Sequence, residues 1–300
     1  MENEKDLSSF SFAALFGVFI LSGGIITAPD NKNSLIPFII AAVLGVISAF
    51  IFLKLSERLF LLKSAVISGI IYAVVIAFSL AFALRAAQEF TGFIYEGVLV
   101  RENKFLIKLI FAACVFCLSL SDRKAIYKFS FLSAVLVTVI FVVLFFTSVK
   151  TFDIKNLKGA FSTDTINLKQ IAYSYSRLFL SVFGAAAFGA KSAKAKGKGA
   201  LAALGTLFGV LLCFLLVFDT VLSFGLPLAS RLSYPYIDDI STVTVGSLFT
   251  RMDGFSYFAF FVCYLLRCAV FTRLSADLVE KSGIKKRKTV TALLIIPLLF

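Results

Sequence analysis

The fold class of this chain is decided by residues 7–29, LSSFSFAALFGVFILSGGIITAP, which carry no charge over 23 positions. As an α-helix rising about 1.5 Å per residue, this stretch is long enough to cross the hydrocarbon core of a bilayer, about 30 Å thick. Four further uncharged stretches of 20 or 21 residues repeat the property: 33–53, 64–84, 129–149 and 199–218. The sequence therefore predicts an all-α, polytopic membrane protein.

The composition of the chain favours the same class. Of 300 residues, 60% are hydrophobic, 36 are phenylalanine and 16% are charged, whereas about 25% of the residues of a soluble domain are charged. The net charge of +13 comes from basic residues in short loops, so we interpret it as a determinant of topology and expect no nucleic-acid partner. The chain lacks histidine and has no recognisable nucleophile–base pair, metal cluster or phosphate-binding loop. We expect neither an enzyme nor a bound cofactor.

Weaker apolar segments complete the expected helices. They are 105–121, 171–190, 254–277 and 289–300, and the first three are interrupted by Lys108, by Arg177, and by Arg267 and Arg273. The last segment, with 12 residues, reaches only about 18 Å. We therefore expect about nine helices, the last one truncated. Loops that a cytoplasmic N-terminus would place inside hold somewhat more lysine and arginine, which favours that orientation.

The polar loop 150–169 divides the helices into two groups: helices 1–5 in residues 7–149 and helices 6–9 in residues 171–300. Two halves of five helices are typical of inverted-repeat transporters, and the second half here is one helix short. No linker separates an extramembrane domain, so we expect residues 1–300 to form one transmembrane domain. In such repeats the first helix of each half is often interrupted near the middle of the membrane, where backbone groups bind the substrate.

Small residues occupy both expected interruptions. Helix 1 contains SGGI at 22–25 followed by Pro29, and helix 6 contains FGA at 183–185. Glycine relaxes the limits on the backbone, and N–H groups freed at the start of a half-helix attract a carboxylate. Tight packing of helices through small residues is the alternative explanation. The candidate binding residues are Ser22, Gly23, Gly24, Ile25, Phe183, Gly184 and Ala185.

Helices 3 and 8 would flank these interruptions and offer further pocket candidates. Tyr72 and Ser79 are seven residues apart and share a helix face, as do Tyr257 and Tyr264. Ordinary aromatic packing is the simpler interpretation for any one of them. The four residues are therefore candidates as a group.

Two basic residues are candidates for coupling or gating. Arg267 lies 14 residues after Asp253, about 21 Å into its helix, where insertion of an arginine costs about 2.5–3.5 kcal/mol. It either gates or couples, pairs structurally, or snorkels towards the inner surface. Lys128 opens helix 5 about one turn from Arg123 and Lys124, which favours an interfacial anchor.

The chain resembles the spore germination proteins of the GerAB type, the membrane B subunits of nutrient germinant receptors. The resemblance spans nearly all of the chain. It rests on SGGII at 22–26 with Pro29, on FG at 183–184 with the basic exit at 191–198, and on Tyr234-Pro235 followed by SLFTRMD at 247–253. That family belongs to the amino acid–polyamine–organocation superfamily, so the resemblance implies a LeuT-like, five-plus-five inverted-repeat fold. In some members a lysine of helix 5 replaces a bound sodium ion, which makes Lys128 a candidate.

The resemblance implies a nutrient-sensing subunit in a cell membrane or a spore inner membrane. An amino acid or similar small nutrient would bind between helices 1, 3, 6 and 8. Its carboxylate would lie on the amides around Gly23 and Gly24, and its ammonium on carbonyls near Gly184. The A and C receptor subunits and the lipid bilayer would be its partners. An amino acid/cation symporter would use the same interruptions, and a non-transporting scaffold is a third alternative.

Overall fold

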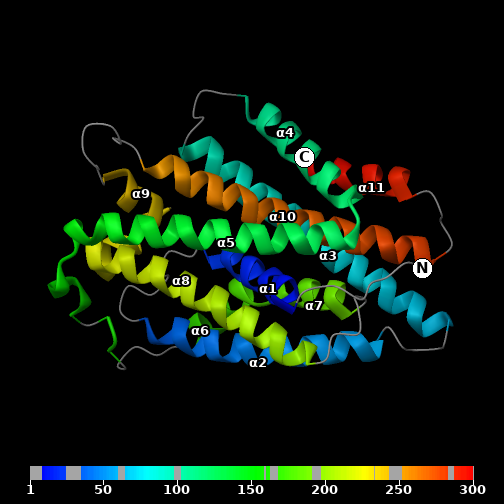
Figure 1. The fold of residues 1–300 in the computed structure, drawn as a ribbon, viewed down its shortest axis with the longest axis horizontal. Helices are drawn as coiled ribbons and strands as arrows, with labels where there is room; N and C mark the ends of the chain where they lie inside the picture. Colours follow the sequence, from blue (N-terminus) through cyan, green and yellow to red (C-terminus); the bar gives the residue numbers. More distant parts are fainter. Residues whose placement is uncertain are drawn as a thin grey trace.

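A computed structural model of the chain describes residues 9–24, 35–59, 65–97, 103–158, 160–162, 168–190, 197–232, 234–242, 252–282 and 287–299. These residues form helices and their connections, and no strand occurs among them (Figure 1). The α-helices are α1 (Ser9–Gly24), α2 (Ile36–Leu59), α3 (Ala65–Gly97), α4 (Lys104–Leu120), α5 (Arg123–Ser148), α6 (Leu168–Leu178), α7 (Val182–Ala190), α8 (Lys198–Ala229), α9 (Pro235–Thr242), α10 (Asp253–Lys281) and α11 (Arg287–Ile295). Short 3-10 helices cover Val149–Thr151, Ile154–Leu157 and Ile296–Leu299.

Among the described residues, five helices are long and apolar enough to cross a membrane, namely α2, α3, α5, α8 and α10. The number rises to six if α6 and α7, bent by 42° at their junction, form one span. Their large apolar side chains also face outward, as lipid-facing helices require: Val43, Ile70 and Leu132 are all more than half exposed. The predicted all-α class is confirmed for the described part of the chain, which has the helices of a polytopic membrane protein.

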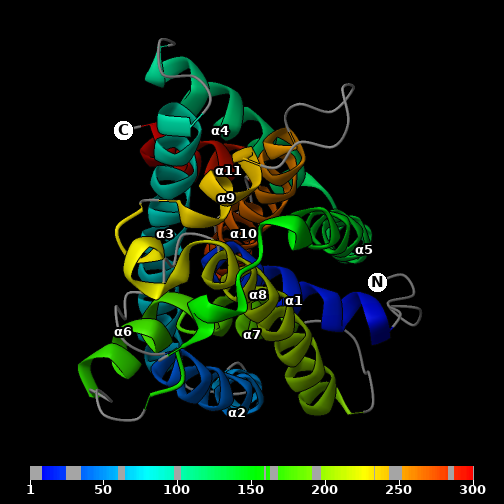
Figure 2. The same ribbon diagram turned by 90° about the vertical axis from the view of Figure 1, so that its left-hand side faces the viewer.

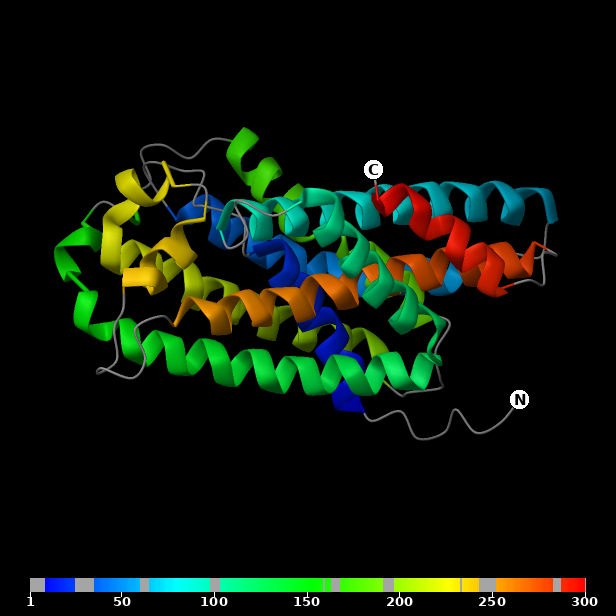
Figure 3. The ribbon, with the colours of Figure 1, turned by 90° about the horizontal axis from the view of Figure 1, so that it is seen from above.

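The central helix of the bundle is α1, which packs against α5, α7, α8 and α10 (Figures 1 and 3). Its sequence is apolar all round, and a helix of that kind is stable only when it is surrounded. Leu15, Phe16, Phe19, Ile20 and Leu21 accordingly expose none of their surface. The N-terminal apolar stretch therefore forms the core of the bundle.

Glycines allow α1 and α8 to touch backbone to backbone. A Cβ atom at Gly205 would lie 2.0 Å from the carbonyl oxygen of Ala13, and one at Gly209 would lie 2.5 Å from that of Gly17. The two glycines of α8 are four residues apart, the spacing of small residues at close crossings of membrane helices. The close contact between the two helices therefore depends on these positions.

Several helix boundaries differ from the predicted segments. The segment 171–190 is divided into α6 and α7, and α1 ends at Gly24, with residues 25–34 outside the described part. Helix α3 continues to Gly97, beyond the predicted end at 84. It passes through Arg85 and Glu89, whose Nε and Oε1 atoms lie 2.9 Å apart one turn from each other. The eight-residue α9 was not predicted because it is too short for an argument from apolar length, although proline at a first helical position is a known start signal.

Candidate functional site

The C-terminal ends of α1 and α6 meet inside the bundle. A Cβ atom at Gly23 would lie 3.1 Å from the carbonyl oxygen of Arg177 and 3.4 Å from the Cα atom of Leu178, the last residue of α6. Only a residue without a side chain leaves this approach unhindered. The last described turn of α1 therefore lies against the last turn of α6, with Gly23 at the point of contact.

The bend between α6 and α7 lies at residues 179–181. The N–H groups of Val182, Phe183 and Gly184 donate to carbonyl oxygens three residues earlier, at 3.0, 3.3 and 2.9 Å. The hydroxyl of Ser181 donates to the carbonyl oxygen of Leu178 at 3.5 Å. Bonds over three residues tighten the backbone, and a serine that bonds back competes with the helical pattern. Together they separate the two helices.

The sequence analysis placed this interruption at Phe183, Gly184 and Ala185, and that position is wrong by a few residues. All three lie within α7, and Gly184 and Ala185 are buried there. A Cβ atom at Gly184 would come within 2.0 Å of the Phe271 ring of α10. Glycine is therefore needed here for packing, the alternative that the sequence analysis left open, and the bend has another cause.

Arg267 is the charged group of this region. It occupies the midpoint of α10, about 21 Å from either end, and exposes only 3% of its surface. From there an arginine side chain cannot reach either end of the helix. Its Nη1 donates to the hydroxyl of Ser22 at 3.4 Å, while that hydroxyl donates to the carbonyl oxygen of Phe19 at 2.8 Å.

The guanidinium of Arg267 is incompletely paired. Its Nε has no hydrogen-bond partner, and the residue makes no ion pair within the described part of the chain. Glu89 of α3 acts on the guanidinium electrostatically but forms no ion pair with it. Incompletely paired charges inside membrane helices line ligand or ion pathways or bind a partner. The Nε–H group of Arg267 is therefore available to donate to an anionic group.

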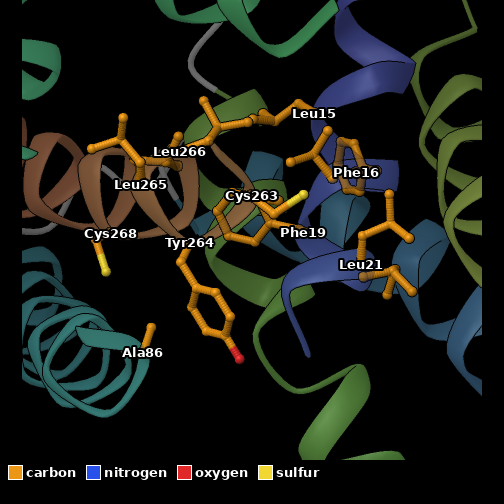
Figure 4. Close-up of a cluster of buried hydrophobic side chains, with 14 of the residues drawn as sticks. Leu15, Phe16, Phe19, Leu21, Ala86, Cys263, Tyr264, Leu265, Leu266 and Cys268 are labelled. Carbon is orange, nitrogen blue, oxygen red and sulfur yellow. The ribbon is translucent and has the colours of Figure 1, made fainter. Parts of the chain in front are cut away.

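Two hydroxyls without partners lie on the helices around Arg267. Tyr264, one turn earlier on α10, is fully buried, and its hydroxyl has no partner in the described part. Figure 4 shows its ring leaving α10 with the hydroxyl oxygen pointing away from the other labelled side chains. Ser79 of α3 is also buried without a partner, one turn before Ala83, whose carbonyl oxygen accepts a hydrogen bond from Cys268 at 3.5 Å. The predicted pocket residues Ser79 and Tyr264 thus belong to the packed surfaces of α3 and α10.

The other predicted residues of helices 3 and 8 lie farther away. Tyr257 precedes Arg267 by ten residues, about 15 Å along α10, and its ring centroid lies 5.0 Å from that of Phe93. Tyr72 lies about two turns from Ser79 and is half-buried. Packing accounts for the position of both tyrosines.

The remaining predicted residues are divided between the edge of the site and the outer surface. Gly24 is the last residue of α1, and Ile25 lies outside the described residues. The ring of Phe183 packs on that of Phe78 at 5.4 Å. Lys128 is exposed on α5, where it does not join the buried group around Arg267.

Two grooves open on the flanks of the bundle, but neither includes Arg267 or Tyr264. One has a volume of about 490 Å³ between α1, α5 and α8, and the other about 390 Å³ between α2, α3 and the α6–α7 bend. Almost all of their lining side chains are apolar. Such surfaces suit lipid chains better than a charged nutrient.

A charged cluster at the C-terminal end of α10 was not predicted from the sequence. Asp277 accepts hydrogen bonds from Nε and Nη2 of Arg123 at 3.0 and 2.5 Å, and from Nε of Arg273 at 2.9 Å. Nη1 of Arg273 also donates to the carbonyl oxygens of Ser119 and Ser121 at 3.1 and 2.7 Å. The spacing of Arg273 and Asp277 by four residues was the available signal. The cluster ties the ends of α4, α5 and α10 together.

The electrostatics of the meeting point can be stated for α6 and α10. Gly23 and Gly24 are the last described residues of α1, so the expected binding of a carboxylate to amides around them stays a prediction. The C-terminal end of α6 carries partial negative charge. It suits an ammonium group, while Arg267 suits a carboxylate.

No model of a known protein family matches this chain, and no curated protein does. The chemistry of the site therefore has to be judged from its own geometry. The site combines the Arg267 guanidinium, the Tyr264 hydroxyl and the end of α6, and no group of three or more histidine, cysteine, aspartate or glutamate side chains that could hold a metal ion occurs in the described ranges. The guanidinium can pair with an anionic group, and neither described groove reaches it.

Proposed function

We propose that this chain is the ligand-binding membrane subunit of a nutrient receptor of the spore germination type. An amino acid or similar small zwitterion binds where α1 and α6 end. Its carboxylate pairs with Arg267, and its ammonium group lies at the carbonyl end of α6, near Arg177. The receptor's A and C subunits then convert binding into a response.

The observation that carries this proposal is the free Nε of Arg267, buried at the midpoint of α10 beside the ends of two helices. A carboxylate ligand would supply the missing counter-charge through charge-assisted hydrogen bonds. The unpaired hydroxyl of Tyr264, one turn away, offers a further polar contact. Ligand binding would thus supply partners for the buried polar groups that have none in the free protein.

A LeuT-like inverted-repeat fold with a cytoplasmic N-terminus is part of the same proposal. Its support is the bend between α6 and α7, together with the contact between Gly23, in the last described turn of α1, and the end of α6, which belongs to the other half of the sequence. In transporters with such repeats, discontinuous helices form the substrate site in the middle of the membrane. The basic loops described above support the orientation.

Ligand binding to the purified full-length chain in detergent tests the proposal. We expect at least one of the twenty common amino acids to raise the thermal unfolding midpoint in a saturable manner. Arg267→Gln removes the charge and should weaken binding at least about 30-fold, because losing one partner of a buried charge pair costs about 2 kcal/mol or more. Tyr264→Phe, which loses only a hydroxyl, should have a smaller effect.

A matched control is Arg85→Gln, since Arg85 is half exposed and pairs with Glu89 on the surface of α3. Its affinity should equal that of the unaltered chain. Binding that survives Arg267→Gln unchanged, or a failure of every amino acid to bind, contradicts the proposed site. If Arg267→Gln does not fold, Arg267→Lys retains the charge but not the planar fork, and weaker binding is again expected.

Uptake into lipid vesicles separates sensing from transport. Binding without accumulation of a labelled amino acid, under an imposed proton or sodium gradient, is expected of a sensing subunit. Accumulation driven by the gradient would instead identify a symporter. In spores that carry this chain, Arg267→Gln should abolish the response to the bound nutrient at an unchanged protein level.

A further inference from the structure

A second buried polar group lies where α9 packs against α5, α8 and α10 (Figures 1 and 2). Its members are Ser148 of α5, Asp219 of α8, Tyr236 and Asp239 of α9, and Ser256 of α10, here called the acidic site. Four of these residues expose none of their surface, and Tyr236 exposes 4%. Two carboxyl groups are therefore enclosed together by four different helices.

The backbone beside the acidic site is held in place by hydrogen bonds from the segment that follows α5. Gly225 has φ 73° and ψ 159°, which interrupts α8 shortly after Asp219. Nδ2 of Asn156, in the segment after α5, donates to the carbonyl oxygens of Leu222 and Ser223 at 2.8 and 3.1 Å. This side chain satisfies carbonyls near the break, as buried backbone groups require. The turn that follows Asp219 is thus fixed in place.

Most oxygen atoms of the acidic site lack partners. The hydroxyl of Ser148 donates to Oδ1 of Asp219 at 2.5 Å. Oδ2 of Asp219 has no hydrogen-bond partner within the described residues. The Ser223 hydroxyl lies close to the carboxyl group of Asp239, and the Ser256 hydroxyl lies close to the hydroxyl of Tyr236, but neither pair has the geometry of a hydrogen bond. Neither carboxyl group makes an ion pair in that part of the chain. Five oxygens are left for another group.

These unpaired atoms are close to one another. Asp219 and Asp239 interact electrostatically, both act on Tyr236, and the Tyr236 hydroxyl lies beside Ser256. Taking two carboxylates out of water costs several kcal/mol for each ion unless an opposite charge compensates. No arginine or lysine of the described residues forms an ion pair with either carboxyl group, in contrast to the Asp277 cluster at the far end of α10.

We propose that the acidic site binds one hard metal cation, Na⁺ or Ca²⁺, through its carboxylate and hydroxyl oxygens. Hard cations prefer oxygen ligands, and Ca²⁺ takes six to eight of them from carboxylates, other protein oxygens and water. The ion neutralises the buried carboxylates and joins α9 to α8 and α10. The site is distinct from the Arg267 region, and the inference does not rest on the proposed nutrient function.

Thermal unfolding of the purified full-length chain in detergent tests this inference. The chain is first treated with a chelator in choline chloride at pH 8, and NaCl or CaCl₂ is then added at constant ionic strength. We expect one of the two salts to raise the unfolding midpoint in a saturable manner. Equilibrium dialysis with radioactive Na⁺ or Ca²⁺ should give about one bound ion per chain.

Substitutions on α9 provide a matched pair. Asp239→Asn should raise the dissociation constant of the cation at least about tenfold, because even loss of an indirect contact can have that effect. Asp238→Asn changes the neighbouring, only partly buried residue, and should leave the constant unaltered. If Asp239→Asn does not fold, Tyr236→Phe removes one oxygen while keeping the ring, and a several-fold increase is expected.

Protons are the competing occupants. Burial raises the pKa of Asp239 to about 7, with the Ser223 hydroxyl opposing the rise, so measurements at pH 8 favour the cation. Asp219 and Tyr236 are the titratable groups that act on this region from α8 and α9. If neither salt raises the midpoint and acidification alone does, the proposed cation site is refuted. Equal loss of the cation effect in Asp238→Asn and Asp239→Asn refutes it as well.

Discussion

Replacing Gly205 with alanine tests whether the close crossing of α1 and α8 holds the bundle together. The new Cβ atom would lie 2.0 Å from the carbonyl oxygen of Ala13, 2.7 Å from its carbonyl carbon and 2.9 Å from its Cα atom. All three atoms belong to the backbone of α1, so no side-chain rotation relieves the clash. The helices must move apart by about 1 Å or more to restore an ordinary contact near 3.5 Å.

The size of the effect follows from two opposing contributions. Overpacking a core costs about 1–3 kcal/mol, and a backbone neighbour places this site at the upper end. Alanine also favours the helix by about 1 kcal/mol relative to glycine. A net loss of about 2 kcal/mol is expected, which corresponds to a fall of about 4–8 °C in the thermal unfolding midpoint.

The matched control is Gly92→Ala in α3, because a Cβ atom there meets nothing within 4 Å. The same chemical change should add up to about 1 kcal/mol to the free energy of unfolding and so raise the unfolding midpoint slightly. Both variants would be unfolded in detergent, with intrinsic fluorescence or light scattering followed on heating. If Gly205→Ala is as stable as Gly92→Ala, the close approach of α1 and α8 does not exist.

Two other substitutions should lower stability for different reasons. Asp277→Ala leaves two partly buried arginines without their carboxylate and should lower the free energy of unfolding by about 2–3 kcal/mol, measured by heat or denaturant. Glu89→Ala breaks an exposed pair and should lower it by under about 1 kcal/mol. Equal losses of stability in the two variants would contradict the role given to Asp277. Gly184→Ala pushes a Cβ atom into the buried Phe271 ring and should lower the free energy of unfolding by about 1–3 kcal/mol relative to Gly92→Ala. An unchanged unfolding midpoint would show that α7 and α10 pack differently.

The candidate site could be predicted only in outline. The sequence pointed to Ser22, Gly23 and Arg267, which lie together at the last described turn of α1, and to Tyr264, one turn before Arg267 on α10. It misplaced the second interruption, because glycine in a helix marks close packing as often as a break. The observed bend depends on hydrogen bonds at residues 179–181, and the residue types in this segment do not predict them.

The sequence by itself determined that the chain is all-α and suited to a membrane. Both properties are local: a segment of about 20 apolar residues must satisfy its backbone hydrogen bonds internally wherever lipid surrounds it.

Only the tertiary structure decided which polar residues meet. Arg267 and Ser22 are 245 positions apart, Arg123 and Asp277 are 154 apart, and Ser148 and Asp219 are 71 apart. Such encounters depend on which helix faces pack together, and the contacts at Gly17, Gly205 and Gly209 help to decide that for α1 and α8. The apolar residues place each helix in lipid, but the shape of the packed helices places the charges.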